Sequence, residues 1–152
     1  KRVSEILILL GVKVIACDLF PDKAWANSNR IRYTSQENLL KESDIISLHV
    51  SPTESDKPVI GRKELDQMKS GMILINTSRG QFIDENALYD GLSSKKIGGV
   101  GLDVYVNEPY DGDLIQFDNV VLTPHVATLT KESRLEMEVE ATQNLLNYFL
   151  QN

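Results

Sequence analysis

The sequence has little cysteine and comparatively few basic residues. Cys17 is the only cysteine among 152 residues, so an internal disulfide is impossible and a cytoplasmic location is the simpler expectation. Lys and Arg total 16 against 22 Asp and Glu, giving a net charge of -6. A negative net charge disfavours a polyanionic partner. We therefore expect a cytoplasmic protein that does not bind nucleic acid.

Long hydrophobic runs are also missing. The apolar opening from Ile6 to Leu10 is short, follows Glu5, and has no small-residue cleavage site after it. These features are untypical of a signal peptide, and we interpret the segment as a buried helix. No run approaches the length needed to span a bilayer. The sequence therefore predicts no membrane partner.

Helix-like and strand-like segments alternate along the chain. Helical spacing from Val3 to Leu10 ends at Gly11, which is placed to act as a left-handed cap. A buried strand is predicted over 12–17, and the pattern continues with strands near 45–50, 73–77, 100–104 and 120–122. Further helices are predicted near 37–42, 63–69, 84–94 and 131–150, the last with an inner face of Leu135, Val139, Thr142, Leu146 and Phe149. This pattern predicts an α/β fold with a doubly wound parallel sheet of Rossmann type, covered on both faces.

The glycine-rich turn of a dinucleotide-binding unit is absent. Such a unit begins with a strand, a G-x-G-x-x-G turn and a helix, whereas this sequence begins at the helix and contains the motif nowhere. We therefore expect residues 1–152 to be a partial nucleotide-binding domain, truncated at the N-terminus. Its sheet should have a gap where the first strand belongs.

Residues that follow the strands are the candidates for function, because doubly wound sheets bind ligands at the carboxyl ends of their strands. The candidates are Asp18, Val50, Ser51, Ser78, Arg79, Asp103 and His125. An acidic residue at the position of Asp18 accepts hydrogen bonds from ribose hydroxyls and repels a 2′-phosphate, which favours NAD over NADP. The alternative is a turn-forming Asp before Pro21.

Three residues have side chains suited to the oxidation of an alcohol. The planar fork of Arg79 suits a carboxylate, and Gly80 would let a ligand approach the backbone. His125 can exchange a proton near neutral pH. Glu108, if hydrogen-bonded to that imidazole, would favour its protonated form and fix its tautomer. Taken singly, each also fits a plainer interpretation: a solvated arginine, a structural histidine and an ordinary loop glutamate.

Several blocks together point to a known family. They are Met68 to Gly80, Asp84 to Leu88, Gly101 to Val104 with Glu108-Pro109, and Thr123 to Ala127. In this order they resemble the D-isomer-specific 2-hydroxyacid dehydrogenases, of the phosphoglycerate dehydrogenase-like kind. The resemblance covers nearly the whole chain.

The resemblance implies an NAD-dependent oxidoreductase that moves a hydride between its cofactor and a small D-2-hydroxy or 2-oxo acid. It implies that Arg79 binds the substrate carboxylate, that His125 is the acid/base, and that Glu108 is its partner. It further implies a homodimer that pairs through its nucleotide-binding domains, a separate substrate domain outside this chain, and no metal. The implied cofactor-binding residues are Asp18, His49, Val50, Ser51, Asp56, Thr77, Ser78, Arg79, Asp103, His125 and Ala127.

The chain departs from the family pattern at two places. In the family, Pro usually follows the apolar residue directly, whereas here Ser51 stands between Val50 and Pro52. Asp56 stands where Thr is common in the family, so the sequence does not decide which residues contact the cofactor diphosphate. Glu108 makes the formate-acting subclass of the family a less favoured interpretation, because those relatives have Gln at this position. Two other functions also stay open: an NAD-sensing, corepressor-like binding module without turnover, and an inert fragment.

Overall fold

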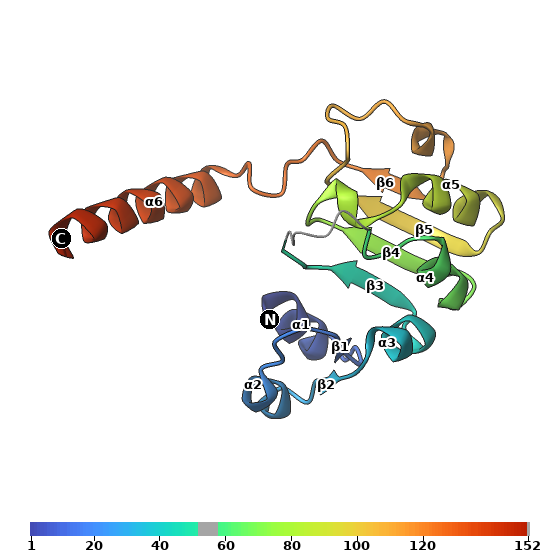
Figure 1. Ribbon diagram of the computed structural model, residues 1–152, viewed down its shortest axis with the longest axis horizontal. Coiled ribbons are helices and arrows are strands. Elements are labelled where there is room, and N and C mark those ends of the chain that lie inside the picture. The colour runs from blue at the N-terminus through green and yellow to red at the C-terminus, as the bar shows by residue number, and fades with distance from the viewer. Residues whose placement is uncertain (52–57, 152) are drawn as a thin grey trace.

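Six parallel strands form two separate sheets in the computed structural model, which describes residues 1–51 and 58–151. The larger sheet has the order β3-β4-β5-β6, with β3 at Ile45–Leu48, β4 at Met72–Asn76, β5 at Ile97–Leu102 and β6 at Val120–Leu122. The smaller sheet pairs β1, Ile15–Ala16, with β2, Arg32–Tyr33 (Figure 1). The predicted α/β class with parallel strands is confirmed.

Helices alternate with these strands. They are α1 Arg2–Leu9, α2 Lys23–Ser28, α3 Gln36–Glu42, α4 Arg62–Gln67, α5 Glu85–Ser93 and α6 Lys131–Gln151, with short 3-10 helices η1 Gly80–Phe82 and η2 Asp113–Gln116. Polar side chains begin several of them: the carboxylate of Asp84 accepts from the backbone N–H of Ala87 at the start of α5. The sequence reasoning missed α2 and β2, which are short.

The hydrophobic core lies between one face of the larger sheet and helices α4 and α5. Alternate residues of β4 point into it, so that Leu74 is 0 % exposed while its neighbour Ile73 is 39 % exposed. Leu88 of α5 is 1 % exposed and packs in the same cluster. Ile45 and Val121 are also exposed, which leaves the opposite face of this sheet open. The predicted doubly wound parallel sheet of Rossmann type is confirmed, although within residues 1–51 and 58–151 these side chains of its second face are exposed.

The region before α3 is far less buried. In residues 1–34 only Ala26 and Ile31 are buried. Helix α1 contains no buried residue, and the two residues of β1 are half-buried because this strand pairs only with β2. The predicted helix and strand are present as α1 and the shorter β1, but their predicted burial is wrong, and Cys17 is exposed. Gly11, with a φ of 79°, does adopt the predicted left-handed conformation after α1.

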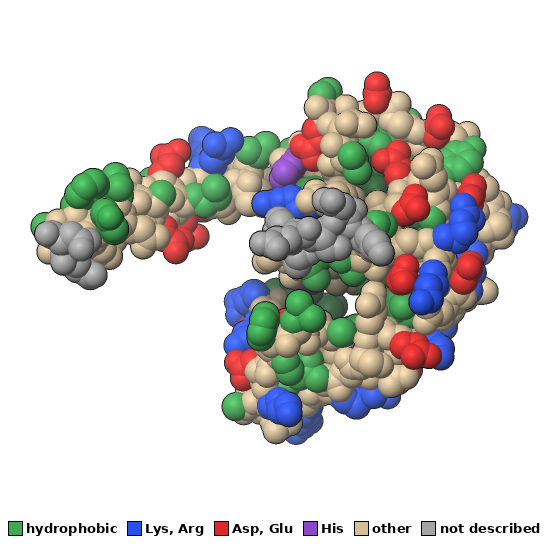
Figure 2. All heavy atoms as spheres, viewed as in Figure 1, with side chains coloured by type: hydrophobic (Ala, Val, Ile, Leu, Met, Phe, Trp, Pro, Cys, Tyr) green, Lys and Arg blue, Asp and Glu red, His purple; other side chains and the backbone are tan. Residues whose placement is uncertain are grey.

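Helix α6 extends away from the body of the molecule (Figure 1). Its start at Lys131 agrees with the prediction, but the predicted inner face lies at the surface, with Leu135 62 % and Phe149 69 % exposed. Hydrophobic side chains are visible along this helix in Figure 2. Among the described residues, no helix combines the length and the apolar character needed to cross a membrane.

Candidate active site

The four strands of the larger sheet end in register, so their carboxyl ends lie at the same edge. The register pairs Leu48 with Asn76, Asn76 with Leu102, and Leu102 with Leu122, so all four strands end side by side. The segments that follow carry His49, Arg79, Asp103 and His125. Parallel pairing thus gathers most of the predicted site residues at one edge.

His125 and Glu108 form a hydrogen-bonded pair at this edge. Nδ1 of His125 lies 2.9 Å from Oε2 and 3.1 Å from Oε1 of Glu108, and both side chains are partly exposed. The hydrogen bond from His125, reinforced by the backbone N–H of Tyr105, holds the pKa of Glu108 below its ordinary value. Since Nδ1 faces a carboxylate, the neutral ring carries its proton there and presents Nε2 as a base.

Asp103 holds the backbone around His125. Its carboxylate accepts hydrogen bonds from the Thr123 hydroxyl at 2.5 Å and from the backbone N–H groups of Val126 at 2.9 Å and Ala127 at 3.0 Å. Burial by itself raises the pKa of Asp103, but these donors outweigh it and keep the pKa below its ordinary value. His125 has a φ of 55°, a left-handed conformation that is uncommon for a residue with a Cβ, and the bonds of Asp103 to the next two residues fix this turn.

This geometry changes the interpretation of Asp103. Asp103 follows β5 at the strand edge, but it is only 5 % exposed and both carboxylate oxygens accept hydrogen bonds within the protein, so its predicted contact with the cofactor stays a prediction. The carboxylate therefore orients the acid/base candidate. Sequence reasoning had no signal for these contacts, because they join backbone groups more than twenty residues away.

Asn76, which the sequence analysis did not select, shapes the turn that carries Arg79. It is 1 % exposed, its amide donates to the carbonyl of Arg79 at 2.8 Å, and its side-chain oxygen accepts from the backbone N–H of Ser78 at 3.0 Å. The Ser78 hydroxyl turns inward and donates to the carbonyl of Leu48 at 2.6 Å. Thr77 and Arg79 are left exposed at the edge. The preference of Asn for turns is the one feature of the sequence that could have pointed to the role of Asn76.

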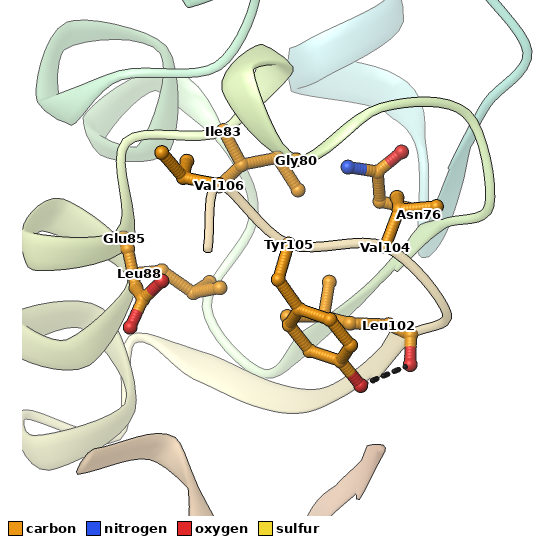
Figure 3. Close-up of a pocket in the computed structure, with 9 residues that line it drawn as sticks. All are labelled: Asn76, Gly80, Ile83, Glu85, Leu88, Leu102, Val104, Tyr105 and Val106. Carbon is orange, nitrogen blue, oxygen red and sulfur yellow. Dashed lines mark hydrogen bonds between the residues drawn. The ribbon is translucent and has the colours of Figure 1, made fainter. Parts of the chain in front are cut away.

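Gly80 brings the Arg79 turn against the segment that carries Glu108. A Cβ at Gly80 would lie 2.0 Å from the carbonyl carbon of Tyr105 and 2.3 Å from the backbone nitrogen of Val106. Figure 3 shows Gly80 beside these two residues. The protein's own backbone therefore occupies the side of Gly80 where a Cβ would point, which explains the glycine without a ligand.

The other predicted cofactor residues lie at strand ends but make few contacts. Asp18 is exposed after β1, and one of its oxygens accepts from the backbone N–H of Phe20 at 2.8 Å, which is a turn contact. His49 lies 3.0 Å from the Ser47 hydroxyl, and partial burial lowers its pKa. The predicted residues Val50, Ser51 and Ala127 are exposed.

Asp56 and Pro52 lie outside the described residues. Within residues 1–51 and 58–151, no cluster of three or more His, Cys, Asp or Glu side chains is arranged to hold a metal ion.

Comparison with known proteins identifies the family. The sequence pattern described as "D-isomer specific 2-hydroxyacid dehydrogenase, NAD binding domain" matches residues 1–127. The chain belongs to this family. The family prediction from the sequence blocks is confirmed, as is NAD as the cofactor of the domain.

Three similar proteins give the extent of the match. A glyoxylate reductase of Korarchaeum cryptofilum is 39 % identical over 140 residues, covering 91 % of this chain and 42 % of that protein. A hydroxypyruvate reductase of Thermotoga maritima is 38 % identical over 149 residues, covering 95 % and 48 %. The crystal structure of the Aquifex aeolicus D-lactate dehydrogenase complexed with NAD and lactic acid superposes with a TM-score of 0.85 at 35 % identity, covering 99 % of this chain and 50 % of that one. The chain thus spans about half the length of these relatives.

Proposed function

We propose that the whole protein is an NAD-dependent oxidoreductase that interconverts a small D-2-hydroxy acid and its 2-oxo acid. The observation that carries this proposal is the His125–Glu108 pair, held by Asp103 at the same strand edge as Arg79. Relatives named for glyoxylate, hydroxypyruvate and lactate support a small acid as substrate.

Each residue of the site has a chemical task in this proposal. Nε2 of His125 takes the hydroxyl proton as the alcohol is oxidised and returns it when the 2-oxo acid is reduced. Glu108 stabilises the imidazolium formed in between, which agrees with its lowered pKa. The exposed fork of Arg79 binds the substrate carboxylate through two parallel hydrogen bonds. NAD, when bound, supplies the hydride acceptor.

The exposed residues at the strand ends fit the cofactor. The carboxylate of Asp18 makes a single turn contact, which leaves its second oxygen for ribose hydroxyls and opposes a 2′-phosphate. Val50, Ser51 and Thr77 offer exposed positions at the ends of β3 and β4. We therefore propose that Asp18 makes the whole protein prefer NAD over NADP.

We also propose that residues 1–152 are part of a larger nucleotide-binding domain. A further strand between β1 and β3, followed by a glycine-rich turn, would join the two sheets and give the cofactor phosphates their site. A substrate domain, a homodimer and a cytoplasmic location belong to the same proposal. The reading frame upstream of Lys1 tests the strand and the turn directly.

The activity is tested with the full-length protein, NADH, and a panel of glyoxylate, hydroxypyruvate, pyruvate and 3-phosphohydroxypyruvate. We expect steady-state oxidation of NADH with at least one of these acids. Arg79→Lys should raise KM and lower kcat for that acid, since an ammonium group cannot reproduce the bidentate fork. Tight NADH binding without turnover on any 2-oxo acid would instead favour the NAD-sensing binding module.

A further inference from the structure

Glu108 lies in a segment that has neither helix nor strand, between the end of β5 and the start of η2. Two tyrosines of this segment, Tyr105 and Tyr110, flank it. Their rings stack, with centroids 4.4 Å apart and an interplanar angle of 23°. The position of Glu108 relative to His125 therefore depends on how these two rings are held.

The two tyrosine hydroxyls are anchored to different parts of the fold. The hydroxyl of Tyr105 lies 3.0 Å from the carbonyl oxygen of Leu102, at the end of β5 (Figure 3). It also lies 2.9 Å from the carbonyl oxygen of Thr123, directly after β6. The hydroxyl of Tyr110 donates to Oε1 of Glu85 at 2.6 Å, in the first turn of α5, and accepts from the backbone N–H of Leu114. The segment is thus fixed to the sheet at one tyrosine and to α5 at the other.

Gly112 lies against the Tyr110–Glu85 hydrogen bond. A Cβ at Gly112 would lie 2.5 Å from the Tyr110 hydroxyl and 2.7 Å from Oε1 of Glu85, so a side chain there would displace these two groups. Gly112 has an ordinary φ of -81°, so a substitution would act through space and not through backbone conformation. Burial, together with the bond to Glu85, raises the pKa of Tyr110, so its hydroxyl stays protonated and remains a donor.

We propose that Tyr110 and Glu85 form a positioning clamp that holds Glu108 against His125. The inference rests on the proposed function, because it assigns the clamp to the acid/base of that reaction. Without the Tyr110 hydroxyl, the segment is free to shift relative to α5, and the Glu108 carboxylate pairs less often with Nδ1 of His125. The imidazolium is then less stable, whereas the cofactor residues at β1 and β3 are untouched.

The other ionisable groups near these residues are few. Asp103 and Tyr105 lie close to the His125–Glu108 pair, and Glu85 and Asp113 face Tyr110. Replacing Tyr110 with Phe removes no charge and keeps the ring stack. Any change in the protonation of His125 would therefore come through the position of Glu108.

The clamp is tested in the full-length protein with Tyr110→Phe, Glu85→Ala and Glu85→Gln. We expect Tyr110→Phe and Glu85→Ala each to lower kcat about tenfold, the size of one lost hydrogen bond to a charged group. Both should move the pH profile of kcat toward lower pH and leave NADH affinity unchanged. Glu85→Gln should restore most of the activity, because it keeps an oxygen that accepts from Tyr110. Tyr89→Phe is the matched control and should leave kcat and its pH profile unchanged, because Tyr89 lies in α5 and, among the described residues, its hydroxyl contacts Gln116 at 3.4 Å and no group of the clamp.

A second measurement does not depend on turnover. The hydrogen bond at Nδ1 of His125 is followed by NMR, with His125→Gln used to assign the ring signal. Tyr110→Phe should change the Nδ1 signal toward that of Glu108→Gln even if no 2-oxo acid is reduced, so the clamp and the proposed function fail separately. An unchanged Nδ1 signal and pH profile in a folded Tyr110→Phe protein would overturn the clamp, even if the variant melts at a lower temperature.

Discussion

Two regions of this chain have similar sequence patterns and very different burial. Residues 36–122 contain the larger sheet and the entire hydrophobic cluster, whereas residues 1–34 bury only Ala26 and Ile31. Both regions alternate apolar strands with amphipathic helices. The difference is in the neighbours: β4 and β5 each pair on both sides, while β1 pairs on one. An apolar pattern identifies a segment that can be buried, but whether it is buried depends on the strands that pair with it on each side.

The comparison also separates the two halves of the proposed site. The His125–Glu108 pair and the Arg79 turn adjoin the packed region, residues 36–122. Asp18 lies in the open region, residues 1–34. We therefore expect mutations in the packed region to affect folding and chemistry strongly, and mutations in the open region to have small effects on folding.

The largest contrast should come from two leucine truncations in the 152-residue chain. Leu74→Ala removes a side chain that is 0 % exposed and should lower the free energy of unfolding by about 2–5 kcal/mol. Leu9→Ala, at a position 87 % exposed in α1, should change it by no more than about 0.5 kcal/mol. Urea-induced unfolding measures both. Similar losses in the two variants would mean that the open region is packed after all.

A smaller loss is expected from Asp103→Asn. The amide keeps one acceptor oxygen and places an N–H group against the donors of the His125 loop, so the free energy of unfolding should fall by about 1–3 kcal/mol. Thermal unfolding measures this loss. Undiminished stability would show that the hydrogen bonds of Asp103 contribute little.

The same aspartate predicts a pH dependence. Because the folded state lowers the pKa of Asp103, its contribution is complete above the ordinary carboxyl pKa of about 4 and is lost as the pH falls through the lower folded value. The stability difference between wild type and Asp103→Asn should therefore shrink below about pH 4. A difference that stayed constant in acid would refute the linkage.

The smallest of these effects is a shift in the pH profile of Glu108→Gln. The neutral amide no longer stabilises the imidazolium of His125, so the profile of kcat in the full-length protein should move to lower pH. Asp111→Asn removes a charge from an exposed position in the same segment and is the matched control. A shift of equal size in both variants would indicate a general charge effect.

Much of the packed region could be predicted from local sequence. Strand β4 follows from an uninterrupted apolar run, and α5 from its helical spacing and the Asp84 cap. The start of β5 at Ile97 was missed because Gly98 and Gly99 conceal a strand. A Cβ at Gly98 would lie 2.2 Å from the backbone oxygen of Gly71, a close approach that no local pattern reveals.

The candidate site also contains residues that the sequence predicts and residues that it does not predict. The predicted parallel topology placed Arg79 and His125 at one edge, and the carboxylate of Glu108 was a candidate partner for the imidazole before the family blocks supported that role. The supporting residues Asn76, Asp103 and Tyr110 act through hydrogen bonds to groups whose positions depend on the tertiary fold. Their roles could not be predicted without the three-dimensional structure.

The proposed role of His125 as the acid/base is best examined with His125→Gln in the full-length protein. Steady-state kcat is measured with the preferred 2-oxo acid, and NADH affinity is measured separately by fluorescence titration. We expect kcat to fall about 10²–10⁴-fold, the usual contribution of a general acid/base, while NADH affinity stays close to that of the wild type. A kcat near the wild-type value would mean that another group transfers the proton and that His125 is not the acid/base.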